Sequence, residues 1–343
     1  MALIEEACFT MKNGKRMLSV RSFYTANKRN VMIAAIVIVA IGVTGSFLLL
    51  TKAAGSIAAT ETESGTKSAQ AKQVADTTAS GGQAVKFTAP AAQGTITHGS
   101  QINTSNTGYL AYVGPAGQTC TDATLVVYNT KPNASSLGAN PFCLWLKQGL
   151  NVDVPITITA SRIDQEVYTN GKRVVLNWVT VNTATPQDYA IGPDNFSVYR
   201  TQLTGSSDGI RFEQADVVES YVRTKLQSPT DHNDGIQGYL ASSGGSILRS
   251  NIDCRPVNGT NATTTGAIFM ADDSQGTVEI RDNYLLGGGY TLRLHESMFY
   301  RVTGNIIEKN SYEYGPISTT NARSGAFLEW SNNKLSDGTV LTP

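Results

Sequence analysis

The sequence predicts an all-β protein built as a right-handed parallel β-helix, a solenoid of short stacked strands, preceded by one transmembrane helix and a disordered linker. Three observations support this fold. The chain has 32 glycines and many Asn, Thr and Ser residues, which suit turns and polar strands. Short apolar segments recur at intervals of roughly 20–30 residues, a period typical of solenoids. Near the N-terminus, residues 31–50 carry no charge at all.

The uncharged run at residues 31–50 is long enough, as a helix, to span a hydrocarbon core of about 30 Å. Basic residues precede it: Arg21, Lys28 and Arg29. Lys52 is the only charge close behind it, so the positive-inside rule places residues 1–30 in the cytoplasm and the rest outside. A signal peptide cleaved near residues 52–55 is the alternative, but its apolar run would usually be shorter. We therefore expect a single-pass anchor in the cell membrane.

The remaining chain divides by composition. Residues 51–94 consist mostly of Ala, Thr, Ser, Gly and Gln, which cannot bury enough surface to offset their ordering entropy, so we expect a flexible linker. Aromatic and apolar residues return from about position 95. We expect residues 95–150 to cap the N-terminal end of the solenoid and residues 151–343 to form the parallel β-helix.

Two columns of repeated positions define the predicted coils. The first places an Asn at a turn between apolar residues, at Asn251, Asn283, Asn305 and Asn333. We expect these amides to bond from coil to coil, with ordinary turn chemistry as the alternative. The second column consists of the apolar residues Ile191, Ile210, Ile236, Ile268, Leu292 and Ile317. Stacking coils about 4.8 Å apart would join these side chains into one core.

Charge and cysteine content narrow the possible roles. The 27 basic and 27 acidic residues cancel, which argues against a nucleic-acid partner. The four cysteines, Cys8, Cys120, Cys143 and Cys254, match no metal-binding spacing. If the solenoid is extracellular, Cys120 and Cys143 can form a disulfide; two buried thiols are the alternative.

Three segments carry a family resemblance: His232-Asn-Asp-Gly-Ile-Gln237, residues 282–292 and residues 312–317. They resemble uncharacterised secreted bacterial members of the pectin-lyase-like β-helix superfamily, over roughly residues 105–341. That superfamily includes polysaccharide lyases, glycoside hydrolases, uronan epimerases and phage tailspikes. The resemblance implies the β-helix fold and an extracellular polysaccharide context, and leaves the reaction open.

The Asp-Gly-Ile segments suggest a site. Asp208 and Asp234 begin equivalent strands on adjacent coils, and two carboxylates that close either bind a cation or share a proton. An Asp before a Gly is also a common turn former, and this alternative stays open. The candidate catalytic residues are Asp208, His232, Asp234, Arg293 and His295. The Asn-Thr-Asp and Asp-Asp motifs of polygalacturonase-like enzymes are missing, which argues against a hydrolase.

Candidate substrate-binding residues surround these acids. Arg211, Gln237, Phe269 and Arg293 each follow an inward residue of the apolar column, so they should face outward together. The candidates for glycan contact are Arg211, Gln237, Tyr290 and Tyr314; a solvated polar face is the alternative. The one cofactor that the sequence suggests is Ca²⁺, held by Asp231 and Asp234.

Two functions remain. The first is a membrane-anchored cell-surface β-helix that binds extracellular polysaccharide or serves as a structural or interaction module. The second is a tethered polysaccharide lyase, epimerase or glycoside hydrolase acting on an acidic glycan. Both involve polysaccharide as the partner and contact with the lipid bilayer through residues 31–50, and neither involves nucleic acid.

Overall fold

The computed structural model describes residues 95–183, 188–225, 232–238, 244–256, 264–270, 276–295, 298–320 and 322–343, together with the strands β1 (Ala71–Ala75) and β2 (Gln83–Phe87). The chain divides into two units, Met1–Thr88 and Ala89–Pro343. In the first unit β1 and β2 pair antiparallel. The predicted cytoplasmic tail and membrane anchor lie outside the described residues. Within those residues, no helix is long and apolar enough to cross a membrane.

The second unit contains three parallel sheets. The seven-stranded sheet contains β7 (Val167–Tyr168), β10 (Tyr189–Gly192), β13 (Asp208–Phe212), β16 (Asn233–Gly238), β19 (Thr264–Met270), β22 (Tyr290–Leu294) and β25 (Gly315–Ser318). The eight-stranded sheet contains β5 (Ile156–Thr159), β8 (Val174–Asn177), β11 (Phe196–Tyr199), β14 (Gln214–Val218), β17 (Gly244–Leu248), β20 (Thr277–Arg281), β23 (Phe299–Thr303) and β26 (Phe327–Ser331). The ten-stranded sheet contains β3 (Val126–Tyr128), β4 (Leu144–Leu146), β6 (Arg162–Ile163), β9 (Thr180–Asn182), β12 (Gln202–Thr204), β15 (Tyr221–Arg223), β18 (Asn251–Asp253), β21 (Tyr284–Leu286), β24 (Ile306–Ile307) and β27 (Lys334–Leu335).

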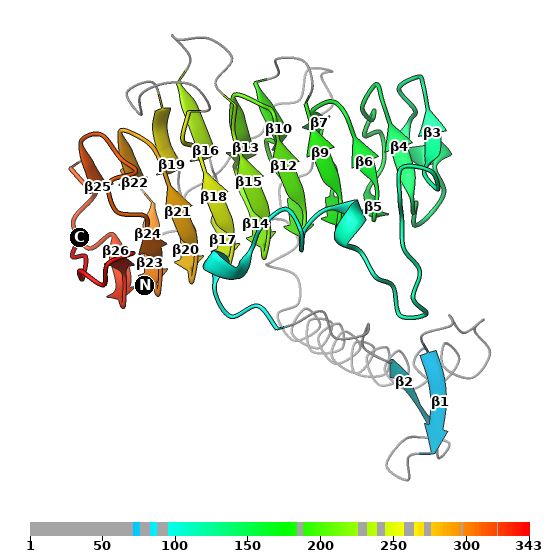
Figure 1. The fold of residues 1–343 in the computed structure, drawn as a ribbon, viewed down its shortest axis with the longest axis horizontal. Helices are drawn as coiled ribbons and strands as arrows, with labels where there is room; N and C mark the ends of the chain where they lie inside the picture. The colour runs from blue at the N-terminus through cyan, green and yellow to red at the C-terminus, as the bar shows by residue number, and fades with distance from the viewer. Residues whose placement is uncertain are drawn as a thin grey trace, which may run out of the picture. The chain divides into compact units, whose positions relative to one another are not determined.

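Each full coil visits the three sheets in the same order, for example β13, β14 and β15, before the chain returns to the first sheet with β16 (Figure 1). Every strand therefore pairs in parallel with its equivalent on the next coil. The helical elements of the described residues are three single 3-10 turns, η1 (Gly99–Gln101), η2 (Tyr109–Ala111) and η3 (Ala134–Ser136). The predicted all-β solenoid is confirmed.

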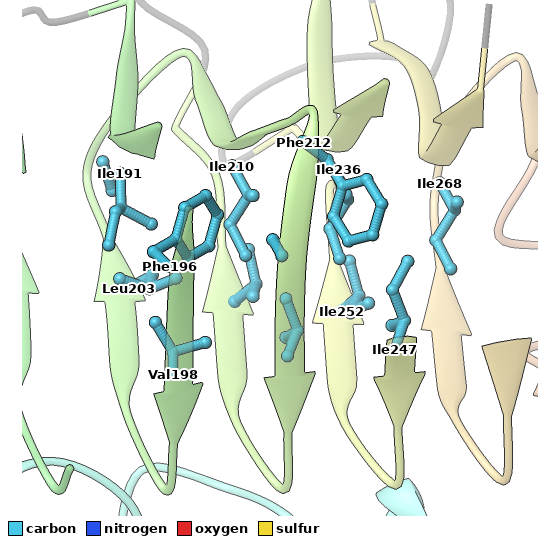
Figure 2. Packing of buried hydrophobic residues seen from close by; sticks show 14 of the residues in the cluster. Ile191, Phe196, Val198, Leu203, Ile210, Phe212, Ile236, Ile247, Ile252 and Ile268 are labelled. Atoms are coloured by element: carbon cyan, nitrogen blue, oxygen red, sulfur yellow. The ribbon is translucent and has the colours of Figure 1, made fainter. Parts of the chain in front are cut away.

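The predicted apolar column forms the core of the seven-stranded sheet. Each member pairs in register with the next, from Ile191 through Ile210, Ile236, Ile268 and Leu292 to Ile317. Figure 2 shows the first four of these residues stacked beside Phe196 and Leu203 of the other sheets. All are buried except Ile317, which is half-buried on the last coil of this sheet.

Tight packing explains the glycine of the Asp-Gly-Ile repeat. A Cβ at Gly209 would lie 2.3 Å from Val222 Cγ1 and 2.4 Å from the Gly235 carbonyl oxygen. At Gly235 it would lie 2.4 Å from both Ile252 Cγ2 and the Ala267 carbonyl oxygen. These distances leave no room for a side chain, so the glycine allows the strands that carry Asp208 and Asp234 to lie close to the core.

A polar ladder follows the corner between the eight-stranded and ten-stranded sheets. Asn283 Nδ2 donates to Asn305 Oδ1 at 3.0 Å, and Asn305 Nδ2 donates to Asn333 Oδ1 at 2.9 Å. Asn251 is not part of this ladder, because it pairs in register with Tyr284 and donates instead to the Ile102 carbonyl. Ser250 occupies the equivalent place, where its N–H donates to Asn283 Oδ1. The predicted amide ladder is thus confirmed at three positions and wrong at Asn251.

On each coil, one residue at this corner adopts a left-handed backbone conformation. These residues are Cys143, Ala160, Trp178, Arg200, Glu219, Arg249, Asp282, Gly304 and Asn332, with φ between 46° and 69°. All but Gly304 carry a side chain, and a non-glycine residue in this region costs of order 1–3 kcal/mol. Where Ser250, Asn283, Asn305 or Asn333 follows, the ladder bonds help to offset this strain.

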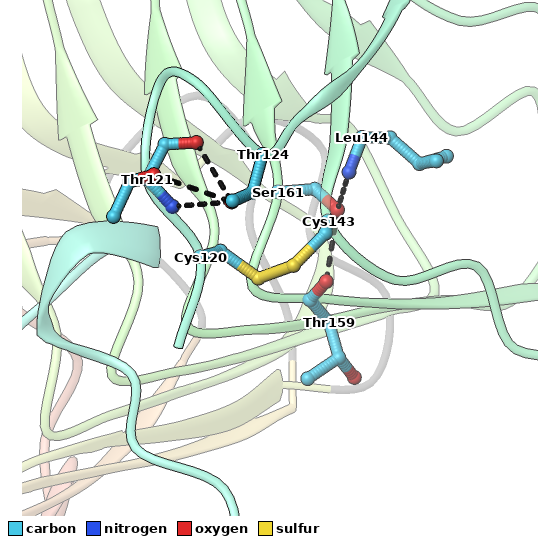
Figure 3. Close-up of a disulfide and its surroundings, with 7 residues drawn as sticks. All are labelled: Cys120, Thr121, Thr124, Cys143, Leu144, Thr159 and Ser161. Atoms are coloured by element: carbon cyan, nitrogen blue, oxygen red, sulfur yellow. Dashed lines mark hydrogen bonds between the residues drawn. A yellow bond between two sulfur atoms is a disulfide. The ribbon is translucent and has the colours of Figure 1, made fainter. Parts of the chain in front are cut away.

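Residues 98–112, which we call the strap, run along this corner rather than over the end of the solenoid (Figure 1). Gly99 N–H donates to the Asp282 carbonyl at 2.7 Å, and Gly108 N–H donates to the Arg200 carbonyl at 2.8 Å. At the far end a disulfide joins Cys120 to Cys143, with the Cα atoms 5.6 Å apart (Figure 3). The region expected to cap the solenoid therefore contains this strap and the first strands, β3 and β4. The predicted disulfide is confirmed, and Cys254 is a buried free thiol.

Candidate functional site

The outer row of the seven-stranded sheet brings several of the predicted residues into line. Directly after the apolar column, Arg211 pairs in register with Gln237, which pairs with Phe269, then Arg293 and Ser318. The first four side chains are half-buried and Ser318 is buried. Successive members are one coil apart, so the row presents cationic, amide, aromatic and hydroxyl groups at a regular spacing of about 4.8 Å.

An acid pair lies beside this row. Asp208 opens β13 and Asp234 lies in β16, each two residues before its member of the apolar column. The Asp234 N–H donates to Asp208 Oδ1 at 3.0 Å, so the two residues are direct neighbours across coils. Both side chains are buried, with residue exposures of 3% and 2%. Both residues lie within strands, so the alternative that they only form turns is wrong.

The two acids differ in their partners. Asp208 Oδ2 forms an ion pair with Arg211 Nη2 at 3.0 Å. Asp234 Oδ1 is buried and has no hydrogen-bond partner among the described residues. Burial, followed by the charge of Asp208, raises the pKa of Asp234 well above its usual value, although the Gly266 N–H and the charges of Arg293 and Arg211 oppose this shift. The direction of this shift favours the protonated form of Asp234, whereas Asp208 is paired with a guanidinium group.

Arg293 projects over an aromatic ring. Its guanidinium carbon lies 4.4 Å from the centre of the Phe269 ring, a cation–π contact. Its Nε is buried without a hydrogen-bond acceptor among the described residues. The Thr291 hydroxyl, on the same strand, also lacks a partner there. Buried donors and a buried carboxyl oxygen without partners in the same sheet are rare in native proteins and require an explanation.

His295 is held in place rather than free to act. Its Nε2 lies 3.2 Å from Ser318 Oγ, and its ring meets Phe269 edge-on at 6.3 Å between centroids. The residue is 5% exposed. These contacts fit a positioning role beside Phe269 better than that of a mobile acid or base.

The other predicted residues lie further from the acid pair or cannot be assigned to it. His232 is exposed just before β16. Tyr290 and Tyr314 form a ring pair 5.7 Å apart, and Tyr314 is 66% exposed. Asp231 lies outside the described residues. Sequence reasoning did not select Ser318 or Thr291, because their significance depends on contacts that only the folded register creates.

The charges of the site do not favour a metal ion. No group of three or more His, Cys, Asp or Glu side chains gathers for metal binding within the described part of the chain. Ca²⁺ takes six to eight oxygen ligands, most of them from carboxylates. Beside Asp208 and Asp234 lie two guanidinium groups, so these residues fit an anion better than a cation.

No family model, curated protein or solved structure matches this chain. The class of the protein is therefore defined by its own architecture. It is a three-sheet parallel β-solenoid with a buried acid pair and two half-buried arginines in its seven-stranded sheet.

Proposed function

We propose that this protein is a cell-surface β-helix of the right-handed, pectin-lyase-like type, and that the outer face of its seven-stranded sheet binds an acidic polysaccharide. The observation that carries the proposal is the register row from Arg211 to Ser318. A row of polar and aromatic groups repeated once per coil suits a linear polymer better than a compact ligand. Tyr290 and Tyr314 extend the aromatic surface along the same sheet.

The charge balance favours a sugar carboxylate as the bound group. Asp208 is paired with Arg211, and the raised pKa of Asp234 favours its neutral form. Arg293 forms no ion pair with any residue that the structure describes, and its Nε lacks an acceptor there. A uronate carboxylate placed near Arg293 would supply that acceptor, and charge-assisted bonds of this kind are among the strongest available.

The acid pair also supports the second function, cleavage or epimerisation of the bound glycan. Such reactions need one group that donates a proton and one that accepts it. Asp234, whose pKa is raised, lies beside Asp208, which pairs with Arg211, and this arrangement suits that need. A raised pKa in a buried carboxyl group often marks an acid–base site. Both groups are buried, so catalysis would require the glycan to reach Asp234 Oδ1.

Two features support placing the solenoid outside the cell. The uncharged run at residues 31–50, with basic residues before it, fits a single-pass anchor with the N-terminus in the cytoplasm. The disulfide between Cys120 and Cys143 fits an oxidising compartment. Full-length protein expressed in a bacterial host should be recovered with the membranes. Unprocessed protein in the soluble fraction would contradict the anchor.

The binding proposal is tested with the full chain in detergent, titrated calorimetrically with polygalacturonate and with alginate. We expect one of them to bind, and Arg293→Ala to weaken that binding about tenfold, the loss of one charge-assisted hydrogen bond. The matched control is Arg301→Ala, which removes a half-exposed arginine from the eight-stranded sheet. Equal affinities of the two variants would contradict the proposed site.

The same samples separate binding from catalysis. Release of new chain ends or of unsaturated uronides by the parent, lost in Asp234→Ala, would identify an enzyme. Intact polymer after long incubation with a protein that binds it would identify a binding protein. Repeating the assay with added Ca²⁺ and with a chelator tests whether a metal participates.

A further inference from the structure

A second group of aromatic side chains lies on another part of the solenoid. Tyr112, Phe142, Trp178 and Tyr199 form a chain of edge-to-face contacts at the corner between the eight-stranded and ten-stranded sheets. The ring centroids are 5.5 Å apart for Tyr112 and Phe142, and 6.2 Å apart for Tyr112 and Trp178 and for Trp178 and Tyr199. None of the residues of the proposed acidic-glycan site belongs to this group.

Two of the rings stand at the ends of a row of residues that pair in register from coil to coil. Phe142 pairs with Thr159, Thr159 with Asn177, and Asn177 with Tyr199, on four successive coils. At about 4.8 Å per coil, the rings of Phe142 and Tyr199 bracket about 14 Å of surface. Trp178 follows Asn177 at the left-handed corner. The strap supplies Tyr112, so the arrangement depends on the folded solenoid.

The row combines accessible rings with free polar groups. Phe142 is 38% exposed and Tyr199 is 39% exposed. The side chains of Thr159 and Asn177, both half-buried, make no hydrogen bond to any described residue. A purely apolar partner would cover these two groups without satisfying them, at a cost of about 1–3 kcal/mol each. A ligand with both flat apolar faces and hydroxyl groups avoids that cost.

The row itself carries no charge. Among the described residues, the cation in contact with these rings is Arg200, which lies over the Trp178 ring at 5.2 Å. It is buried and forms an ion pair with Glu219 at 2.7 Å. The buried Arg200, already paired with Glu219, is therefore a poorer counter-charge for an acidic sugar than Arg293 on the seven-stranded sheet.

We infer that this aromatic row is a second binding site, for a neutral oligosaccharide. The rings of Phe142, Tyr199 and Trp178 would contact the apolar faces of successive sugar rings. The Asn177 amide and the Thr159 hydroxyl would bond the sugar hydroxyls between them. The site lies on a different face from the proposed acidic-glycan site and does not depend on it.

The test uses the full chain in detergent and a set of neutral probes: cellohexaose, xylohexaose, laminarihexaose and mannohexaose. Binding is measured by calorimetry, and the fold of each variant by thermal melting. We expect at least one probe to bind, and Tyr199→Ala to weaken it about three- to tenfold, the range for an aromatic contact. Asn177→Ala should produce a loss of about the same size, since it removes a hydrogen bond. The control is Tyr168→Ala, which removes another exposed tyrosine, on the seven-stranded sheet, and should bind like the parent.

The inference is overturned if none of the four probes binds, or if Tyr199→Ala and Asn177→Ala bind like the parent. Binding lost in Arg293→Ala but retained in Tyr199→Ala would place the neutral sugar on the other face and would also overturn it. Because polygalacturonate and alginate are titrated separately, failure here is distinguishable from failure of the acidic-glycan proposal.

Discussion

The corner ladder and the acid pair are two columns of buried polar side chains in this solenoid. They differ in how much of their hydrogen-bonding capacity is used within the protein. In the corner ladder, the Asn305 amide donates to Asn333 and to the Ile280 carbonyl, while its oxygen accepts from Asn283. In the acid pair, Asp234 Oδ1 has no partner among the described residues, and the nearby Arg293 Nε has none there either. The first column uses its bonding capacity within the protein, whereas the second leaves part of it unused.

This difference separates a structural role from a functional one. A fully bonded buried network fixes the stacking of coils and gains nothing from a ligand. An unsatisfied buried carboxyl group lowers stability, and such groups persist in native proteins mainly where they serve binding or catalysis. The comparison predicts that substitutions in the two columns will change stability in opposite directions.

The largest effect is expected from a new carboxylate on the core side of β16. Ile236→Asp should lower the free energy of unfolding by about 4–5 kcal/mol, because it buries a charge with no partner. Urea denaturation measures this loss. The control Ile236→Val should cost only about 1 kcal/mol. A tolerated Ile236→Asp would show that the core register is wrong and would remove the contrast with Asp234.

The corner ladder is tested next. Asn305→Ala should lower the free energy of unfolding by about 3 kcal/mol, because it leaves polar groups of both neighbouring amides, Asn283 and Asn333, buried without a hydrogen-bond partner. Asn251→Ala is the matched control: it loses one bond, to the Ile102 carbonyl, but it also removes a buried oxygen without a partner among the described residues, so it should cost less than about 1 kcal/mol. Equal losses at the two positions would mean that the ladder has no cooperative contribution.

In the acid pair the expected sign is reversed. Asp234→Asn should raise the free energy of unfolding at neutral pH by about 1–2 kcal/mol, because it removes a carboxyl group that resists ionisation. The raised pKa means that the folded state binds this proton more tightly than the unfolded state, whose pKa is near 3.8. Stability of the parent should therefore fall as pH rises from that value toward the folded pKa, and the variant should lack this fall. Denaturation curves over a pH series measure it. Parallel pH profiles would contradict the assignment.

The smallest effect is expected at a neutral group, where the role of an unsatisfied hydrogen bond can be tested without a change of charge. Thr291→Val should raise the free energy of unfolding by about 0.5–1 kcal/mol, because the Thr291 hydroxyl is buried without a partner among the described residues. Thr169→Val is the opposite control, since the Thr169 hydroxyl donates to Asp194 at 2.9 Å and its loss should destabilise by about 1 kcal/mol. If both variants change stability in the same direction, hydrogen-bond satisfaction does not decide the outcome.

Stacking made the fold predictable from the sequence. Ile210, Ile236 and Ile268 could be aligned because a parallel solenoid repeats the same inward position on every coil. The error at Asn251 is a shift of one residue in register. Ile247 pairs with Ile280 in the structure, so the residue equivalent to Asn283 is Ser250 rather than Asn251. Ser250 then takes the ladder position, since a hydroxyl can bond there as an amide does.

The candidate site was predicted in part for the same reason. Asp208 and Asp234 open equivalent segments, so their adjacency followed from the repeat alone. The partnering of Asp208 with Arg211, the burial of His295 and the contact of Arg293 with Phe269 depend on side-chain directions that no pattern encodes. The path of the strap was also hidden, because His98 meets the Gly304 carbonyl 206 residues further along the chain.

The strap determines where a pulling force would enter the folded solenoid. His98 and Gly99 are bonded to the Gly304 and Asp282 carbonyls, so tension on the chain before residue 95 is first transmitted to these late coils. It would reach the early coils only after the bonds at Ile102 and Gly108 had broken in turn. Beyond them the covalent link between Cys120 and Cys143 ties the chain to the first coils. A solenoid bound by such a strap resists mechanical unravelling from its N-terminal end, because the strap must first be detached from the corner along which it runs.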